Sequence, residues 1–183
     1  NVSDLIFVEG SLEKNKVEIF FDYIKVGFEH IIPKGWDHIV FVLGLFFFSN
    51  KLRPLIWQIS AFTFAHTVTL ALGSLGYVKI VPEIVEPLIA LSIVFIAVEN
   101  IFIRNLSKWR PLVIFVFGLL HGLGFASVLG EFGLPSGFFT PALLGFNVGV
   151  EFGQLTVVLL AFIFVGYWFN SKNYYSSSIA KPI

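Results

Sequence analysis

The stretch Phe146-Asn147-Val-Gly-Val-Glu151-Phe-Gly-Gln154 places two amides and a carboxylate inside one apolar run, residues 140–169. The run exceeds the roughly 20 residues that a helix needs to cross a bilayer. It therefore predicts a membrane helix. Asn147, Glu151 and Gln154 follow one another at i, i+4 and i+7, which puts them on one side of that helix. Ionisable groups at membrane depth are costly, so this polar face indicates a functional site.

The composition of the whole chain agrees with a membrane protein. Of its 183 residues 56% are hydrophobic and 13% charged, with a mean hydropathy of +0.85, whereas soluble domains are about 45–50% apolar and about 25% charged. The net charge is zero, so no electrostatic argument favours a nucleic-acid partner. Cysteine and methionine are absent, which excludes thiolate and thioether ligands. Because Asn1 is not a translation start, we expect that the N-terminus was processed or that the chain continues upstream.

The predicted fold class is an all-α integral membrane protein, a bundle of five to six membrane helices. Residues 17–32 carry charged side chains at near-helical spacing, which suits an interfacial or partial helix, and Pro33-Lys34-Gly35 breaks it. The next run, 36–49, is short for a span, so part of the preceding segment is expected to complete it. The run 140–169 is long enough to be tilted, or broken near Gly145, Gly149 and Gly153. The predicted boundaries are a polar extracytoplasmic tail at 1–16, a membrane domain at 17–170 with spans at 36–49, 54–73, 82–103, 111–129 and 140–169, and a polar tail at 171–183.

Basic residues in the linkers predict the orientation. Cytoplasmic loops are enriched in Lys and Arg. The loops after the first and third spans and the C-terminal tail hold most of them, which favours an outside N-terminus and an inside C-terminus. We therefore expect a multi-pass protein of the bacterial inner membrane with lipid as a partner. A homo-oligomer or a larger membrane complex stays open.

All four histidines lie in or beside apolar runs, and two of them flank His30-Ile-Ile-Pro-Lys-Gly-Trp-Asp37-His38. Imidazole together with carboxylate is a ligand set for borderline divalent metals. With the predicted topology, most of these groups fall at one depth in the outer half of the membrane. The candidate metal ligands are His30, Asp37, His38, His66, His121 and Glu151. The candidate supporting or pathway residues are Thr63, Thr69, Glu99, Asn100, Asn147 and Gln154.

Structural roles are the alternative for several of these residues. His66 and His121 could each form a hydrogen bond across helices, and Asp37 could cap its helix. Glu99 and Asn100 suit an exit gate, an inner cap or a structural pair. Glu151 is harder to explain in this way, because a lone carboxylate at that depth needs a cation, a proton or a donor.

Four ordered motifs resemble the HupE/UreJ family, small bacterial membrane proteins that are associated with hydrogenase and urease systems and regarded as nickel or cobalt permeases. The resemblance covers roughly residues 20–168, and the chain looks closer to the branch with an extracytoplasmic segment before the membrane module. It implies that His30, Asp37, His38 and His121 handle the metal. The motifs are His30…Gly35-Trp36-Asp37-His38, Phe62-Thr63-Phe64-Ala65-His66-Thr67-Val68-Thr69-Leu70, Leu120-His121-Gly122-Leu123-Gly124-Phe125-Ala126, and the Phe146–Gln154 stretch.

The chain departs from the hydrogenase-type pattern in two places. Six residues separate His30 from Asp37, where that pattern has five. The pattern also has a glutamate shortly after the histidine of the third motif, and Leu123, Gly124 and Phe125 stand there instead; Glu151 could replace it. These departures bear on the identity of the metal more than on metal binding.

The predicted function is transport of a divalent transition metal, nickel or cobalt by resemblance, through an intramembrane His/Asp/Glu site that opens outward. An enzyme is the less favoured reading. It would be an intramembrane hydrolase of a lipid or lipoprotein, with Zn²⁺ activating water and Glu151 as the general base. The other alternative is a non-catalytic subunit of a larger membrane complex, in which the polar residues only join helices.

Overall fold

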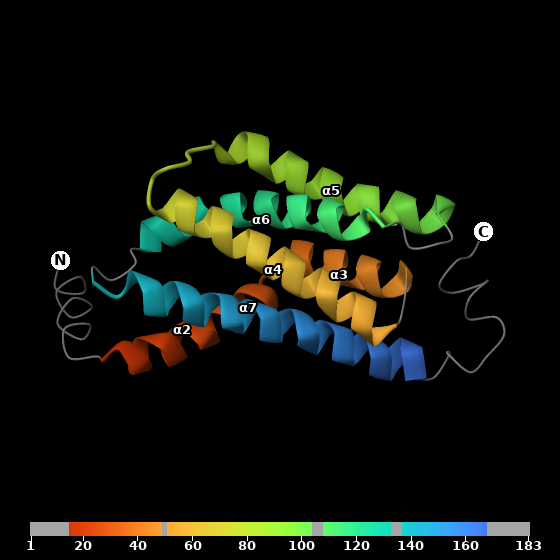
Figure 1. Ribbon diagram of the computed structural model, residues 1–183, viewed down its shortest axis with the longest axis horizontal. Helices are drawn as coiled ribbons and strands as arrows, with labels where there is room; N and C mark the ends of the chain where they lie inside the picture. Colours follow the sequence, from red (N-terminus) through yellow and green to blue (C-terminus); the bar gives the residue numbers. More distant parts are fainter. Residues whose placement is uncertain (1–14, 49–50, 104–107, 133–136, 168–183) are drawn as a thin grey trace.

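The computed structural model describes residues 15–48, 51–103, 108–132 and 137–167, and every regular element in these ranges is helical. Most of the predicted N-terminal tail and the whole C-terminal tail lie outside them. Figure 1 shows the helices running along one common long direction. They are α2 (Lys16–Ile31), α3 (Trp36–Phe48), α4 (Leu52–Ser74), α5 (Pro82–Phe102), α6 (Arg110–Phe132) and α7 (Phe139–Ala161), followed by the π-helical η1 (Phe162–Tyr167).

Three helices in the described residues are long and apolar enough to cross a membrane: Leu52–Ser74, Pro82–Phe102 and Phe139–Val165. α2 and α3 pass the same test only as a pair, with a bend of 73° between them, and Arg110–Ala126 is a shorter apolar helix. Segments 17–32 and 36–49 therefore correspond to two arms of a bent helix pair. The break at Pro33-Lys34-Gly35 lies near the middle of the bundle (Figure 1).

The helix α7 is continuous through its glycines, so the alternative of a break at Gly145, Gly149 or Gly153 is wrong. The glycines instead form a smooth face against α2. A Cβ at Gly145 would collide with the backbone of Phe20, and one at Gly149 with the backbone of Ile24. Small residues let two helices approach closely where lipid supplies no hydrophobic drive between them. The regular α-helix ends only at Ala161, where the six residues of η1 begin.

A second glycine face joins α6 to α4. A Cβ at Gly118 would meet the backbone of Phe62, and one at Gly122 would meet the backbone of His66 and the hydroxyl of Thr69. The two pairs, α2 with α7 and α4 with α6, make the most extensive helix contacts of the described chain. The first pair packs α2, which carries His30, against α7, and the second packs α4, which carries His66, against α6, which carries His121.

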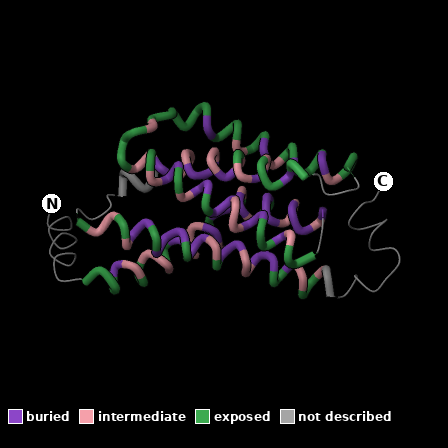
Figure 2. The backbone as a smooth tube through the Cα atoms, viewed as in Figure 1, coloured by how far each residue is buried: buried purple, intermediate pink, exposed green. Residues whose placement is uncertain are grey.

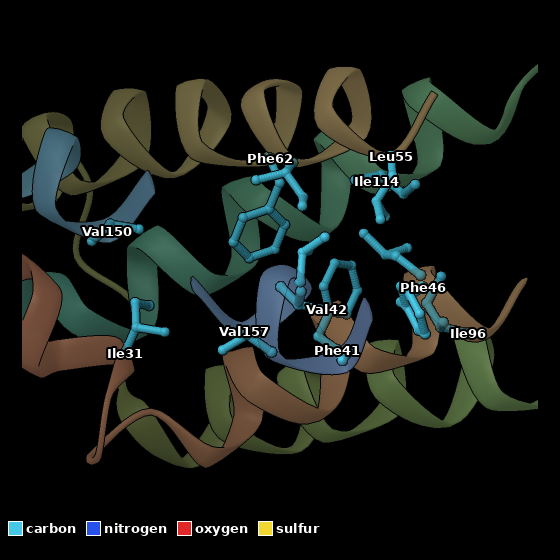
Figure 3. Close-up of a cluster of buried hydrophobic side chains, with 14 of the residues drawn as sticks. Ile31, Phe41, Val42, Phe46, Leu55, Phe62, Ile96, Ile114, Val150 and Val157 are labelled. Atoms are coloured by element: carbon cyan, nitrogen blue, oxygen red, sulfur yellow. The ribbon is translucent and has the colours of Figure 1, made fainter. Parts of the chain in front are cut away.

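Phenylalanine and branched aliphatic side chains fill the space between the helices. Figure 3 shows Phe41 and Phe46 of α3 pointing toward Phe62 of α4 and Ile114 of α6. Figure 2 shows that burial is concentrated on the inward sides, whereas α5 is exposed along much of its length. In water, each fully buried Leu, Ile or Phe side chain would stabilise a bundle by about 1.5–3 kcal/mol. In lipid, van der Waals packing between the helices provides the stabilisation instead.

Candidate metal centre

The break between α2 and α3 gathers three of the predicted ligands. His30 occupies the last turn of α2, and Asp37 and His38 occupy the first turn of α3. Pro33 and Gly35 interrupt the helix, and the chain bends by 73° between the two arms, so both arms present imidazoles to the same space. The His30 and His38 ring centroids are 5.0 Å apart.

The other two histidines reach this space from α4 and α6. The ring of His66 lies 5.8 Å from that of His38, and the ring of His121 lies 4.9 Å from it. His38, His66 and His121 are 2%, 0% and 1% exposed. Imidazoles buried to this extent need partners, so the bonds made by their nitrogens define the chemistry of the site.

The ligand atoms fall into two overlapping groups among the described residues. One group is His30, His38 and His66, and the other is Asp37, His38 and His121; within each, one ligand atom per residue lies within 4.8 Å of the others. Tetrahedral donors around a bound ion would stand about 3.3–3.4 Å apart, given metal–nitrogen bonds of about 2.0–2.1 Å. Small inward movements of the side chains would therefore close either group.

Hydrogen bonds fix which nitrogen of His38 and of His66 carries its lone pair. The Asp37 carboxylate accepts from Nδ1 of His38 at 3.0 Å, so the lone pair lies on Nε2. Asn147 donates its amide to the carbonyl of Leu143 at 2.8 Å, so its oxygen faces Nδ1 of His66 at 3.3 Å. His66 also keeps its lone pair on Nε2. Within the described chain, Nε2 of His30, His38 and His66 are all buried without a hydrogen-bond partner.

His121 has the opposite arrangement. Ser92 of α5 donates its hydroxyl proton to the carbonyl of Ile89 at 2.7 Å and lies 3.2 Å from Nε2 of His121. The serine oxygen therefore accepts from Nε2, and the lone pair of His121 is on Nδ1. That nitrogen is buried without a hydrogen bond among the described residues and faces Asp37 Oδ2 at 3.9 Å.

Aromatic rings wall the site. Phe125 lies 4.0 Å from the ring of His30 and stacks on Phe146 at 5.1 Å. On the side of His121, Phe62 lies at 4.9 Å and Phe41 at 5.5 Å. These apolar walls exclude water from the imidazoles and strengthen the electrostatic interactions between them and an ion.

The polar face of α7 lies against α4, but only its first member reaches the histidines. Asn147 bonds His66 as described above. Glu151, predicted as a ligand, accepts from the Ser60 hydroxyl at 2.7 Å and belongs to neither group. Gln154 accepts from Thr63 at 2.9 Å. Glu151 thus has the donor partner that its depth requires.

The remaining predicted residues have structural partners. Thr69 donates to the carbonyl of Leu119 on α6 at 2.8 Å, close to Gly122. Asn100 donates to the carbonyl of Gly44 on α3 at 2.8 Å. Glu99 pairs with Arg110 at 2.6 Å, which favours the structural pair over the gate.

Two members of these networks, Ser92 and Arg110, are not predicted from the sequence. A serine in an apolar run is a weak signal, since hydroxyls bond their own helix in many membrane segments. Arg110 falls between the predicted spans 82–103 and 111–129, but it begins α6 and is buried over the ring of Phe48, with the guanidinium carbon 3.7 Å from the ring centroid.

A bundle of apolar helices with buried imidazoles and one carboxylate at a helix break defines a membrane protein with a candidate metal centre. The family model described as HupE / UreJ protein matches residues 8–183, nearly the whole chain, and the chain belongs to this family. The family is associated with nickel and cobalt transport. No curated protein and no solved structure matches the chain.

Proposed function

We propose that this protein carries a divalent transition metal ion of the nickel or cobalt type across the bacterial inner membrane. The ion is the substrate, and His30, Asp37, His38, His66 and His121 bind it. The observation that carries the proposal is the set of three buried Nε2 atoms that have no hydrogen-bond partner among the described residues. They come from three helices and surround one space.

The break in the helix pair supports transport over permanent binding. Discontinuous membrane helices place substrate and ion sites near mid-membrane in many transporters. Here the ligands sit on both sides of such a break, so a change in its angle changes the coordination. Only imidazoles and one carboxylate are offered by the two groups, which suits an exchangeable ion.

The proposed topology has five crossings, with the α2–α3 pair as the first and α4, α5, α6 and α7 as the rest. This topology is supported by the position of α2 at one end of the bundle and of the end of α7 at the other (Figure 1). The distribution of Lys and Arg then puts the N-terminus outside and the C-terminus inside. In this arrangement the ion enters from the N-terminal end.

The test is uptake of Ni²⁺ or Co²⁺ into proteoliposomes that contain a metal-sensitive dye. We expect uptake by the wild-type protein and its loss in His38→Ala, because His38 belongs to both groups. Thr156→Ala is the matched control, since that hydroxyl bonds only the carbonyl of Phe152 in its own helix and should leave uptake unchanged. Metal binding without uptake by wild-type protein would contradict transport.

A zinc-dependent hydrolase is the second candidate, because three imidazoles with an open position are also a catalytic zinc set. The location of Glu151 argues against it, since the carboxylate assigned as general base bonds Ser60. Stoichiometric Zn²⁺ that survives dialysis would favour the enzyme, and weakly held Ni²⁺ or Co²⁺ favours the permease. The absence of binding under any loading condition would leave only the accessory subunit.

A further inference from the structure

The two groups of ligand atoms share one residue, His38, and this has a consequence for how many ions the protein holds. We propose that the centre binds a single ion that alternates between two adjacent positions. One position is formed by His30, His38 and His66, and the other by Asp37, His38 and His121. The inference rests on the proposed function and adds the number of ions bound and the two ligand sets between which the ion moves.

The first position is already prepared for an ion by its hydrogen bonds. Asp37 and Asn147 hold Nδ1 of His38 and His66, which leaves both Nε2 lone pairs for a metal. A carboxylate or carbonyl behind the far nitrogen is the usual support of a metal-bound imidazole, because it fixes the ring and raises its basicity.

The second position has its own independent preparation. Ser92 accepts from Nε2 of His121, so Nδ1 is the free donor atom, and it faces the carboxylate of Asp37. The two positions thus lie against different helices: the first beside Asn147 of α7 and the second beside Ser92 of α5.

His38 prevents both positions from being filled together. A neutral imidazole has one lone pair and one N–H, so the shared ring can complete only one position at a time. Charge gives the same answer. The groups contain a single carboxylate, Asp37, and two divalent ions beside it would leave most of their charge uncompensated in a buried, apolar-walled space.

Alternation makes a quantitative statement about affinity. The observed association constant is the sum of the constants for the two positions, so the stronger position alone accounts for at least half of it. Two variants, each lacking one position, are compared with wild type. The variant that keeps the stronger position should have an association constant within about twofold of that of wild type. His38→Ala weakens both positions and should lose much more, about tenfold or greater, in line with the usual effect of perturbing a ligand shell.

The experiment is a Co²⁺ titration of the purified full chain in lipid nanodiscs by calorimetry, with visible absorption to report the ligand set. The variants are His66→Ala for the first position, His121→Ala for the second and His38→Ala for both. His66→Gln and His121→Gln preserve side-chain polarity should an alanine variant fail to fold. We expect one Co²⁺ per chain in wild type and in the better-binding set variant, with absorption spectra that differ between the two set variants.

Three results would overturn the proposal. Two Co²⁺ per wild-type chain would show simultaneous occupation. Losses above tenfold in both His66 and His121 variants, with unchanged melting temperatures, would show one combined site. Full affinity in a folded His38→Ala would show that the residue is not shared. Absence of Co²⁺, Ni²⁺ and Zn²⁺ binding by wild type would instead refute the proposed function itself, and the alternation with it.

Discussion

At the scale of single residues, the hydrogen bonds behind the imidazoles decide what the site can do. The sequence predicts the residue types and, through the i, i+4, i+7 spacing, the face that carries Asn147 and Glu151. It does not predict that Asn147 donates to the carbonyl of Leu143 and so turns its oxygen toward His66. It also does not predict that the Ser60 hydroxyl donates to the Glu151 carboxylate. Both outcomes depend on how α4 and α7 are rotated against each other, and every polar residue on a shared face is equally eligible until that rotation is known.

Replacing Asn147 by Leu should weaken metal binding without removing a ligand. The substitution keeps the size of the side chain but leaves Nδ1 of His66 without its acceptor, so the ring loses its fixed orientation. Loss of such a support typically costs 10–100-fold in metal affinity, which a Co²⁺ titration measures. Its effect is confined to the first position, so the measurement is made in the His121→Ala background, where no second position contributes.

Glu151→Gln is the companion variant, because Glu151 lies four residues away on the same helix and bonds Ser60 rather than a histidine. Its affinity should stay within about twofold of the parent. An equal loss in both variants would mean that the polar face of α7 acts as one unit and that the nitrogen assignment is wrong.

At the scale of elements, the sequence predicts helix positions well and their continuity poorly. The expected spans 54–73 and 82–103 match α4 and α5 to within two residues at each end, because Pro and Gly mark the boundaries. For the run that contains the glycines of α7, the sequence predicts either a tilt or a break, because glycine weakens a helix; it does not predict that these glycines serve close packing. The role of these glycines becomes clear only when the adjacent helix is known. That helix is α2, which lies more than a hundred residues earlier in the chain.

The glycine face of α6 gives a paired test of packing. Gly122→Ala should destabilise the protein by about 1–3 kcal/mol, the usual cost of an overpacked contact, although alanine is the better helix former by about 1 kcal/mol. Its Cβ would press on the backbone of His66 and on Thr69. The melting temperature of the apo protein and the affinity for Co²⁺ should both decrease, because the displaced backbone carries the ligand His66.

Gly124→Ala is the control, two residues further along the same helix. There the new Cβ meets mainly the Cδ1 atom of Ile89 at 2.7 Å, the end of a side chain that can rotate. We expect a small change in melting temperature and no change in affinity. A larger effect at Gly124 than at Gly122 would contradict the close α4–α6 contact.

At the scale of the whole molecule, one buried ion pair ties four helices together. Glu99 of α5 pairs with Arg110 of α6, whose Nε also donates to Gln58 of α4 at 3.1 Å and whose guanidinium lies over Phe48 of α3. A structural pair is one of the roles that the sequence predicts for Glu99, but the sequence does not identify Arg110 as the partner, because Arg110 sits at the edge of an apolar run and counts toward loop charge. Only the tertiary arrangement shows that it is buried.

Glu99→Gln should cost about 3–5 kcal/mol of stability, because it leaves the guanidinium buried without its counter-charge. Unfolding by denaturant in nanodiscs would measure this loss. The double variant Glu99→Gln/Arg110→Met should recover much of the loss, since it removes the orphaned charge and keeps an apolar chain over Phe48. Glu83→Gln, on the exposed first turn of α5, is the matched control and should change little. A Glu99→Gln protein as stable as wild type would show that the pair is dispensable.

The bend of 73° between α2 and α3 is an angle about which the two arms of the helix pair can move relative to each other. α2 is fastened to α7 by its glycine contacts, whereas α3 packs chiefly against α5 and α7, and His30 stands on one arm with Asp37 and His38 on the other. A change in the angle between α2 and α3 therefore changes the separation between His30 and His38, while Asp37 and His38 stay together on α3. An ion that is coordinated from both arms resists that motion. The affinity for the ion and the stiffness of the bend between α2 and α3 therefore change together.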